Sequence, residues 1–153
     1  MMALCMAPAQ LRAAAFDVTA YGARGDGKTL DTAAIQKAID AAATAGNGVV
    51  VFKPGVYLSG ALFLKSRMEL RLDAGSQIRG VQDLAAYPVM QTRVAGIEMQ
   101  WPSALINVYQ QSHVKIGGKG TIDGDGKIWW DKYWKMRREE YEPKGLRWAV
   151  DYD

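Results

Sequence analysis

The stretch Gly46–Gly80, GNGVVVFKPGVYLSGALFLKSRMELRLDAGSQIRG, decides the fold. Its short segments rich in apolar and β-branched residues are bounded by Gly, Pro, Asp or Lys-Ser, and each predicts a strand. These strands are expected at Val49–Phe52, Val56–Leu58, Leu62–Leu64, Met68–Leu72 and Ser76–Ile78. Phe52 and Leu72 lie 20 positions apart, which is about one coil of a parallel β-solenoid.

The same pattern continues further along the chain. Strands are predicted at Ala104–Val108, His113–Ile116 and Gly120–Ile122. Between the two groups, Val81–Pro102 forms a long polar insertion, which we expect to be a loop on one face. The predicted fold class is all-β, a right-handed parallel β-helix, of which residues 16–153 form an incomplete N-terminal part.

An amphipathic helix is predicted ahead of the first strand of this ladder. Asp31 is the expected N-cap, and the helix should run to about Thr44 and stop at Gly46-Asn47-Gly48. One face of the helix is apolar: Ala34, Ile35, Ala38, Ile39 and Ala42. Since the first coil of a solenoid exposes unpaired backbone groups and its apolar interior, we expect this helix to cap it.

The segment before the helix is predicted to be a short strand followed by a turn. Phe16–Ala20 alternates in polarity, which indicates the strand. Gly22, Gly25 and Gly27 then punctuate the turn, where positive φ angles favour glycine.

The composition is that of one ordinary globular domain. The chain has 153 residues, 49% of them hydrophobic, enough for a single core. Its net charge of +3 favours plain surface charge over a polyanionic partner. Nucleic-acid binding is not expected, because no basic cluster is denser than Lys135–Arg138 and no reader motif is present.

The N-terminal residues differ from the rest. Met1–Ala9 is apolar and small, and Ala13–Ala15 supplies an A-x-A pattern before Phe16, so residues 1–15 are interpreted as a signal-peptide remnant, with a disordered tail as the alternative. The expected location is secreted or periplasmic. The apolar run is too short to span a membrane. Cys5 is the only cysteine, so a mature chain without it has no disulfide, iron–sulfur cluster or catalytic thiol.

Two motifs resemble a known family. Phe16–Ala42, FDVTAYGARGDGKTLDTAAIQKAIDAA, followed by Gly46–Gly80, is similar to the start of many β-helix proteins, phage tail proteins included. Gly117–Trp130, GGKGTIDGDGKIWW, with RWAVDYD at Arg147–Asp153, resembles more specifically the N-terminal portion of the family 28 glycoside hydrolases. These are the polygalacturonase-like enzymes of the pectate-lyase-like β-helix superfamily.

The resemblance implies an activity but assigns no catalytic residue here. Members of the family hydrolyse α-1,4-galacturonide bonds in pectin, or related rhamnogalacturonan or xylogalacturonan, with inversion and without a cofactor. Their Asn-Thr-Asp, Asp-Asp, His-Gly and Arg-x-Lys motifs are all missing from this sequence. The chain is therefore interpreted as the N-terminal fragment of a longer, monomeric, pectin-binding enzyme, and it is expected to be inactive alone.

The two aspartates of TIDGDG, Asp123 and Asp125, are the first candidate site. They begin like a calcium loop, but no third ligand or closing acidic residue follows at the required spacing, so no metal is expected. The glycines lack the Lys-Ser/Thr of a phosphate loop. A glycosidase pair would need both carboxylates to face one cleft. We favour aspartates that bond backbone amides at a tight corner.

The remaining candidates are aromatic or basic. Trp129 and Trp130 could stack on sugars, but burial of at least one under an adjoining loop is favoured. His113, the only histidine, could act as an acid or base, although a structural or exposed role in a strand is favoured. Lys135–Arg138 and Arg147 could face an acidic polymer, or could belong to a solvated helix with Glu139, Glu140 and Glu142.

Two further function classes stay open. A non-catalytic β-helix module, such as a tailspike-like adhesin or a carbohydrate-binding domain, would grip glycans without cleaving them. A lyase on this fold commonly needs calcium and a basic residue, and the sequence offers no acidic cluster for the ion.

Overall fold

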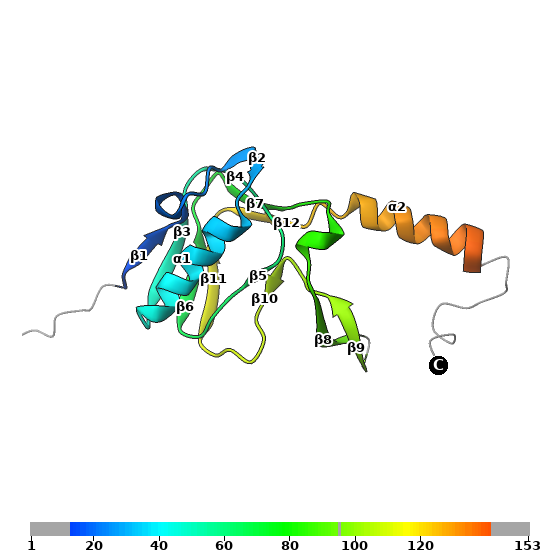
Figure 1. Cartoon of the computed structure of the whole chain (residues 1–153). Coiled ribbons are helices and arrows are strands. Elements are labelled where there is room, and N and C mark those ends of the chain that lie inside the picture. Colours follow the sequence, from blue (N-terminus) through cyan, green and yellow to red (C-terminus); the bar gives the residue numbers. More distant parts are fainter. Residues whose placement is uncertain (1–12, 95, 142–153) are drawn as a thin grey trace, which may run out of the picture.

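The computed structural model describes residues 13–94 and 96–141 (Figure 1). Short strands dominate it: β1 (Ala15–Asp17), β2 (Asp26–Leu30), β3 (Gly48–Phe52), β4 (Gly55–Ser59), β5 (Leu62–Phe63), β6 (Met68–Leu72), β7 (Ser76–Gly80), β8 (Val89–Val94), β9 (Ile97–Pro102), β10 (Ile106–Asn107), β11 (Val114–Gly118) and β12 (Thr121–Asp123). The helical elements are η1 (Val18–Tyr21), α1 (Thr32–Thr44), η2 (Leu84–Ala86), α2 (Lys127–Met136) and the π-helical turn η3 (Arg137–Tyr141).

Most strands belong to three parallel sheets, which the chain visits in a repeated order. The sheets run β1-β3-β6-β11, β12-β7-β4-β2 and β10-β5. The chain therefore passes from β3 through β4 and β5 to β6, and later from β10 to β11 and β12. Phe52 pairs with Leu72 and Val50 with Leu70 in parallel register, which confirms the 20-residue spacing expected from the sequence.

The core lies between these sheets. Alternate residues are buried in β4, β6 and β7, so the buried residues of strands paired in register stack upon one another. Phe52 meets the Tyr57 ring edge-on at 5.2 Å, and both are buried. The fully buried members of the core are Val18, Ile35, Ala38, Ile39, Ala42, Val50, Phe52, Leu62, Leu70 and Ile78.

Helix α1 packs its apolar face onto this core, as its periodicity predicts. The helix ends at Thr44, shortly before Gly46, whose φ of +82° is not helical. Asp31 occupies the N-cap position of α1, as predicted. The hydrogen bond expected of an N-cap is not formed, because the Asp31 carboxylate accepts no N–H of the helix. It instead accepts hydrogen bonds from the backbone N–H groups of Arg24 (2.8 Å) and Gly25 (3.0 Å). The buried Asp31 side chain thus holds the preceding turn against the helix.

A side chain of α1 also satisfies the edge of β5. The amide of Gln36 donates to the Phe63 carbonyl and accepts from the Phe63 N–H, each at 3.0 Å. A neighbouring parallel strand would bond these same two backbone groups. Gln36 therefore occupies the hydrogen-bonding position of a strand along this edge.

The structure corrects three local predictions. The strand expected at Phe16–Ala20 ends at Asp17 and gives way to η1. The glycine-rich turn contains the strand β2, although Gly22, Gly25 and Gly27 do have positive φ. His113 precedes β11 rather than belonging to it, with φ +57°.

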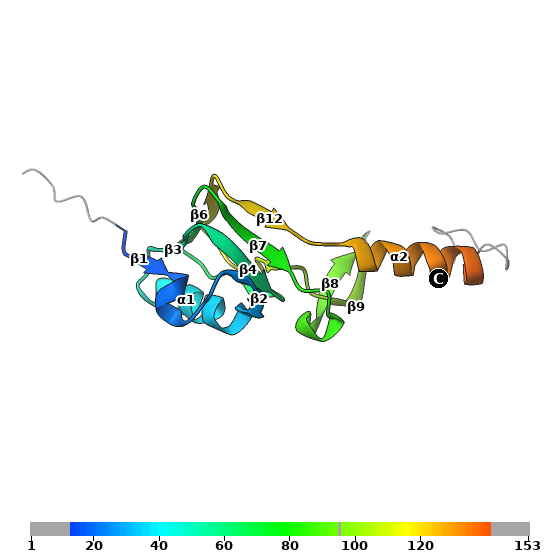
Figure 2. The same ribbon diagram turned by 90° about the horizontal axis from the view of Figure 1, so that it is seen from above.

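The insertion Val81–Pro102 is a hairpin rather than an irregular loop. Strands β8 and β9 pair antiparallel from Val89↔Pro102 to Val94↔Ile97. This pair stands outside the three parallel sheets, so the parallel prediction for the ladder holds. Figures 1 and 2 both place the hairpin and α2 at the end of the molecule away from β1.

The three parallel sheets share one open side in the described part of the chain. Strands β10, β11 and β12 each have a neighbour on one side only. Ile116 is in register with the buried Leu70, and Ile122 with the buried Ile78. Both isoleucines nevertheless stay 46% and 42% exposed. The apolar interior is thus uncovered at this side.

Candidate functional site

Of the two aspartates of TIDGDG, Asp123 bonds a backbone amide at a corner, so the favoured interpretation is met for Asp123. The Asp123 carboxylate accepts from the Asp125 backbone N–H (2.9 Å) and from the Gln77 side-chain amide (3.1 Å). Asp125 itself has φ +43° and follows the end of β12. No group of three potential metal-ligating acids, histidines or cysteines occurs among the described residues.

Trp129 and Trp130 have different neighbours, and neither side chain is fully buried. Trp129 is half-buried and meets the ring of Tyr87 edge-on at 6.0 Å. Trp130 is 62% exposed and lies against Trp134, with 6.5 Å between ring centroids. The favoured interpretation, burial of at least one, is therefore met only in part, by Trp129.

The basic candidates do not come together. His113 is exposed at its corner. In the Lys135–Arg138 group, Lys135 lies 4.0 Å from Glu139 and the Arg137 guanidinium lies 5.3 Å from the Trp134 ring centroid. Arg147 lies outside the described residues, as does Glu142. The charged side chains in the described part of this segment therefore fit a solvated helix better than a site where basic groups face one ligand.

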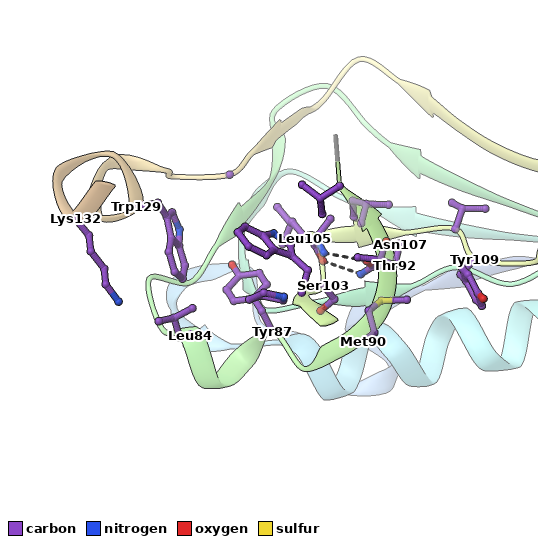
Figure 3. Close-up of a pocket in the computed structure, with 17 residues that line it drawn as sticks. Leu84, Tyr87, Met90, Thr92, Ser103, Leu105, Asn107, Tyr109, Trp129 and Lys132 are labelled. Atoms are coloured by element: carbon purple, nitrogen blue, oxygen red, sulfur yellow. Dashed lines mark hydrogen bonds between the residues drawn. The ribbon is translucent and has the colours of Figure 1, made fainter. Parts of the chain in front are cut away.

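A pocket of about 850 Å³ lies in the described part of the chain (Figure 3). Four segments build it: η2, the β8–β9 hairpin, the stretch from Ser103 to Tyr109, and the start of α2. The size falls within the usual range for small-molecule sites. Figure 3 shows Tyr87 and Trp129 toward one end and Tyr109 at the other, with Ser103 between them.

The pocket wall is largely apolar and aromatic. Its lining residues are Leu84, Tyr87, Met90, Thr92, Val94, Trp101, Pro102, Ser103, Ala104, Leu105, Ile106, Asn107, Val108, Tyr109, Gly124, Trp129 and Lys132. Trp101 and Tyr109 remain 46% and 54% exposed, so two of the four rings keep open faces. The pKa of Tyr87 is raised by burial and, to a lesser extent, by the charge of Asp125.

The polar groups of the wall have different roles. Asn107 is saturated: it donates to the carbonyls of Leu62 (3.2 Å) and Ala104 (2.7 Å) and accepts from the Ala104 N–H (3.0 Å). It fixes the shape of the wall. The Tyr87 hydroxyl donates to the Val81 carbonyl (2.9 Å). The Ser103 hydroxyl, by contrast, is buried with no hydrogen-bond partner among the described residues.

Of this site, the sequence analysis identified Trp129 alone. Tyr87 and Trp101 fall within Val81–Pro102, where the sequence predicts a polar loop, while Ser103 and Tyr109 flank the strand predicted at Ala104–Val108 and belong to no motif. The signal that could have found the hairpin was the content of β-branched and aromatic residues in VMQTRV at Val89–Val94 and IEMQWP at Ile97–Pro102, with Gly96 between the two runs. No described helix has the length and apolar character needed to cross a bilayer.

Comparison with known proteins places the chain in a family. The model of the family described as rhamnogalacturonase A/epimerase, pectate lyase-like matches residues 15–130. The chain belongs to this rhamnogalacturonase A/epimerase family. The match includes all three parallel sheets, the hairpin and the start of α2, and so covers every lining residue of the pocket except Lys132.

Relatives of this chain include galacturonan hydrolases. It is 40% identical over 119 residues to an exo-poly-α-D-galacturonosidase of Dickeya chrysanthemi, covering 72% of this chain and 19% of that one. The solved family 28 exopolygalacturonase of Yersinia enterocolitica is 36% identical, with a TM-score of 0.68, over 74% of this chain and 21% of that one. The resemblance to family 28 glycoside hydrolases is confirmed.

Another relative is named for a different role. The plasmin and fibronectin-binding protein A of Streptococcus pneumoniae is 43% identical over 121 residues, covering 74% of this chain and 16% of that protein. The chain spans about a fifth of the length of these relatives.

Proposed function

We propose that this chain forms the N-terminal part of a polygalacturonase-like glycoside hydrolase that cleaves glycosidic bonds in pectin-type polysaccharides. The observation that carries the proposal is the 40% identity with an exo-poly-α-D-galacturonosidase inside a matching family. The proposed reaction is inverting hydrolysis, in which one carboxylic acid protonates the leaving oxygen and a carboxylate activates water. A polymeric pectin substrate favours a secreted or periplasmic location.

The proposed complete fold is a right-handed parallel β-helix capped at its N-terminal end by α1. The repeated order of the parallel sheets and the 20-residue register support the coil. Two features of α1 support the cap, namely its buried apolar face and the Gln36 amide that bonds the edge of β5.

The chain alone is proposed to lack glycosidase activity. Inverting glycosidases need two carboxyl groups about 6.5–9.5 Å apart across the scissile bond. No acidic side chain is among the described residues that line the pocket. The Asp123 carboxylate accepts a hydrogen bond from the Asp125 backbone N–H. The lack of acidic residues in this described lining supports the proposed inactivity.

Activity measurement tests this proposal directly. The purified chain incubated with polygalacturonate should release no reducing ends above a protein-free blank. Release above the blank would refute the inactivity. Sequencing the encoding DNA past Asp153 tests the enzyme assignment itself, because Asn-Thr-Asp and Asp-Asp motifs within roughly the next hundred residues are required.

A second candidate function is a non-catalytic adhesin or glycan-binding module. The pneumococcal relative, named for binding plasmin and fibronectin, favours it specifically. DNA that continues into a trimerising or repeat region without the carboxylate motifs would support the adhesin and exclude the hydrolase.

A further inference from the structure

Helix α2 extends away from the parallel sheets in both views of the molecule (Figures 1 and 2). None of its side chains is fully buried. Near its start, Trp129 meets the ring of Tyr87 edge-on at 6.0 Å. In the next two turns, Trp130 is 62% exposed and Trp134 is 38% exposed. Neighbouring exposed tryptophans on one helix indicate an interaction surface.

The side chains of α2 and of the turn η3 divide into two faces, because successive residues of a helix lie about 100° apart. One face is aromatic and apolar apart from one arginine: Trp129, Trp130, Tyr133, Trp134, Met136 and Arg137. The other face is charged: Lys127, Asp131, Lys132, Lys135, Arg138 and Glu139. Ile128 is the exception, on the charged side. The segment is therefore amphipathic.

The aromatic face is a packed cluster that includes a cation. Trp130 and Trp134 stack, with 6.5 Å between ring centroids and 30° between ring planes. The ring of Tyr133 meets Trp134 edge-on at 5.2 Å. The Arg137 guanidinium lies 5.3 Å from the centroid of the Trp134 ring. Because Trp130 and Arg137 both lie against the Trp134 ring, little of its face is open to a stacking sugar.

Arg137 also argues against a dry protein partner. A guanidinium inside an apolar protein interface loses its water, and this cost is offset only when an anion is buried with it. At a membrane surface, the same group stays at the level of the lipid phosphates while its stem and the neighbouring rings lie deeper. Tryptophan and tyrosine favour the same boundary between headgroups and acyl chains. The mixed composition of this face fits a lipid surface.

The charge balance of the segment favours anionic lipids. Residues 127–141 include five basic and three acidic side chains. Two of the acidic ones form i,i+4 pairs, Asp131 with Lys127 and Glu139 with Lys135. An excess of positive charge beside an aromatic face is typical of helices that lie in the plane of a membrane surface. Such a helix does not need the length of one that crosses the bilayer.

We propose that α2 is an interfacial helix that attaches this chain to the surface of bilayers containing anionic lipids. The rings of Trp130 and Trp134 enter the boundary between headgroups and acyl chains, and Arg137 and Arg138 contact lipid phosphates. The attachment is independent of the reaction in the proposed function, because it requires no carboxylate pair.

Vesicle flotation of the purified chain tests the attachment. The chain should float with vesicles of phosphatidylglycerol and phosphatidylcholine in equal parts, and hardly at all with phosphatidylcholine alone. Raising the ionic strength to about 1 M should weaken the binding severalfold, because salt screens the attraction between charges. Equal binding to the two kinds of vesicle would overturn the preference for anionic lipids.

Replacing both Trp130 and Trp134 by alanine should weaken vesicle binding at least about tenfold, because the apolar area that enters the membrane is lost. Trp101→Ala, which removes a similarly exposed tryptophan from β9, is the matched control and should bind like the wild type. Since both replaced rings are exposed, the midpoint of thermal unfolding should stay close to that of the wild type. A double variant that floats like the wild type would overturn the proposal.

The charge contribution has its own pair of variants. Arg137→Gln combined with Arg138→Gln should weaken binding to the anionic vesicles about five- to thirtyfold. Lys28→Gln combined with Lys37→Gln removes the same charge from exposed positions outside α2 and should change the binding little. Equal effects of the two pairs would show that net charge alone attracts the chain, which would overturn the role of α2.

A polysaccharide is the other occupant that the experiment distinguishes. A wild-type chain that stays on immobilised polygalacturonate through Trp130 and Trp134, and does not float with vesicles, would replace the membrane proposal by a glycan surface. Absence of both flotation and retention would overturn the membrane proposal as well. Neither result affects the hydrolase assignment, which is judged by the carboxylate motifs in the DNA past Asp153.

Discussion

At the scale of single residues, Asp31 shows how one carboxylate sets the geometry of a turn. It is buried, and its two oxygens accept the N–H groups of Arg24 and Gly25. Gly25 has φ +62°, and a methyl group there would lie 2.8 Å from the Tyr57 ring. The side chain of Asp31 and the missing side chain of Gly25 thus jointly allow the turn to sit against β4.

Replacing Asp31 by Asn should destabilise the fold. The amide nitrogen cannot accept a hydrogen bond, so one of the two backbone N–H groups loses its partner. We expect a loss of about 1–3 kcal/mol in the free energy of unfolding, measured by denaturant titration. Asp131→Asn, at an exposed pair with Lys127 on α2, is the control and should change stability little. Equal effects of the two substitutions would contradict this account.

Asp26 should make stability sensitive to acid. Hydrogen bonds from the backbone N–H groups of Thr29 and Lys28, and from the Thr29 hydroxyl, lower the pKa of Asp26 from 3.8 to about 2. Because the folded pKa lies below the unfolded one, the Asp26 carboxylate stabilises the fold above about pH 4. That contribution is lost as the pH falls toward 2.

Carbon-detected NMR titration of the Asp26 carboxyl checks this assignment. The midpoint should lie near 2 in the wild type, and Thr29→Val should move it upward because one hydrogen bond to the charged form disappears. A wild-type midpoint near 3.8 would show that these bonds do not persist in solution.

At the scale of elements, α1 takes the place of a neighbouring strand through its side chains. The Gln36 amide bonds both backbone groups of Phe63 on the edge of β5, while Thr32 accepts the N–H of Gly60 (2.8 Å). A helix has no free backbone donors and acceptors along its side, so side chains must bond the neighbouring edge.

Gln36→Ala should expose this edge and lower the free energy of unfolding by about 1–2 kcal/mol. The amide of Phe63 should also exchange with deuterium faster, because its hydrogen-bond acceptor has been removed. Lys37→Ala, on the exposed side of the same helix, is the matched control. Unchanged exchange at Phe63 in Gln36→Ala would refute the strand-like role of this side chain.

At the scale of the whole molecule, the uncovered side of the three sheets should promote association. Unpaired strand edges and exposed apolar side chains together favour contacts between copies. Ile116 and Ile122 stack on core residues but remain exposed. Sedimentation velocity should therefore show a mean mass that rises with protein concentration.

The double substitution Ile116→Lys and Ile122→Lys should reduce this association, since charged side chains block edge-to-edge contacts. Leu30→Lys is the control, because Leu30 is 56% exposed on β2, away from the open side. A wild-type chain that sediments as a monomer at all concentrations would contradict the prediction.

The ladder could be predicted from the sequence because its signals are local and repeated. Apolar segments of three to five residues between turn-forming residues specify short strands, and the spacing of Phe52 and Leu72 equals their pairing register. The periodicity of α1 predicted its buried face, Ile35, Ala38, Ile39 and Ala42. These local signals suffice because each coil repeats the same alternation of short apolar segments and turn-forming residues.

The pocket required the folded chain. Tyr87, Ser103 and Trp129 lie far apart in the sequence and meet because a hairpin folds back beside the start of α2. Whether a serine hydroxyl finds a partner depends on atoms brought from other segments, and no local pattern encodes this. Asp31 is a similar case. The sequence predicts its position before α1, but the packing of the preceding turn decides that its carboxylate accepts the N–H groups of Arg24 and Gly25. Short-range preferences therefore specify the strands and the helix, and long-range packing specifies which polar groups find hydrogen-bond partners.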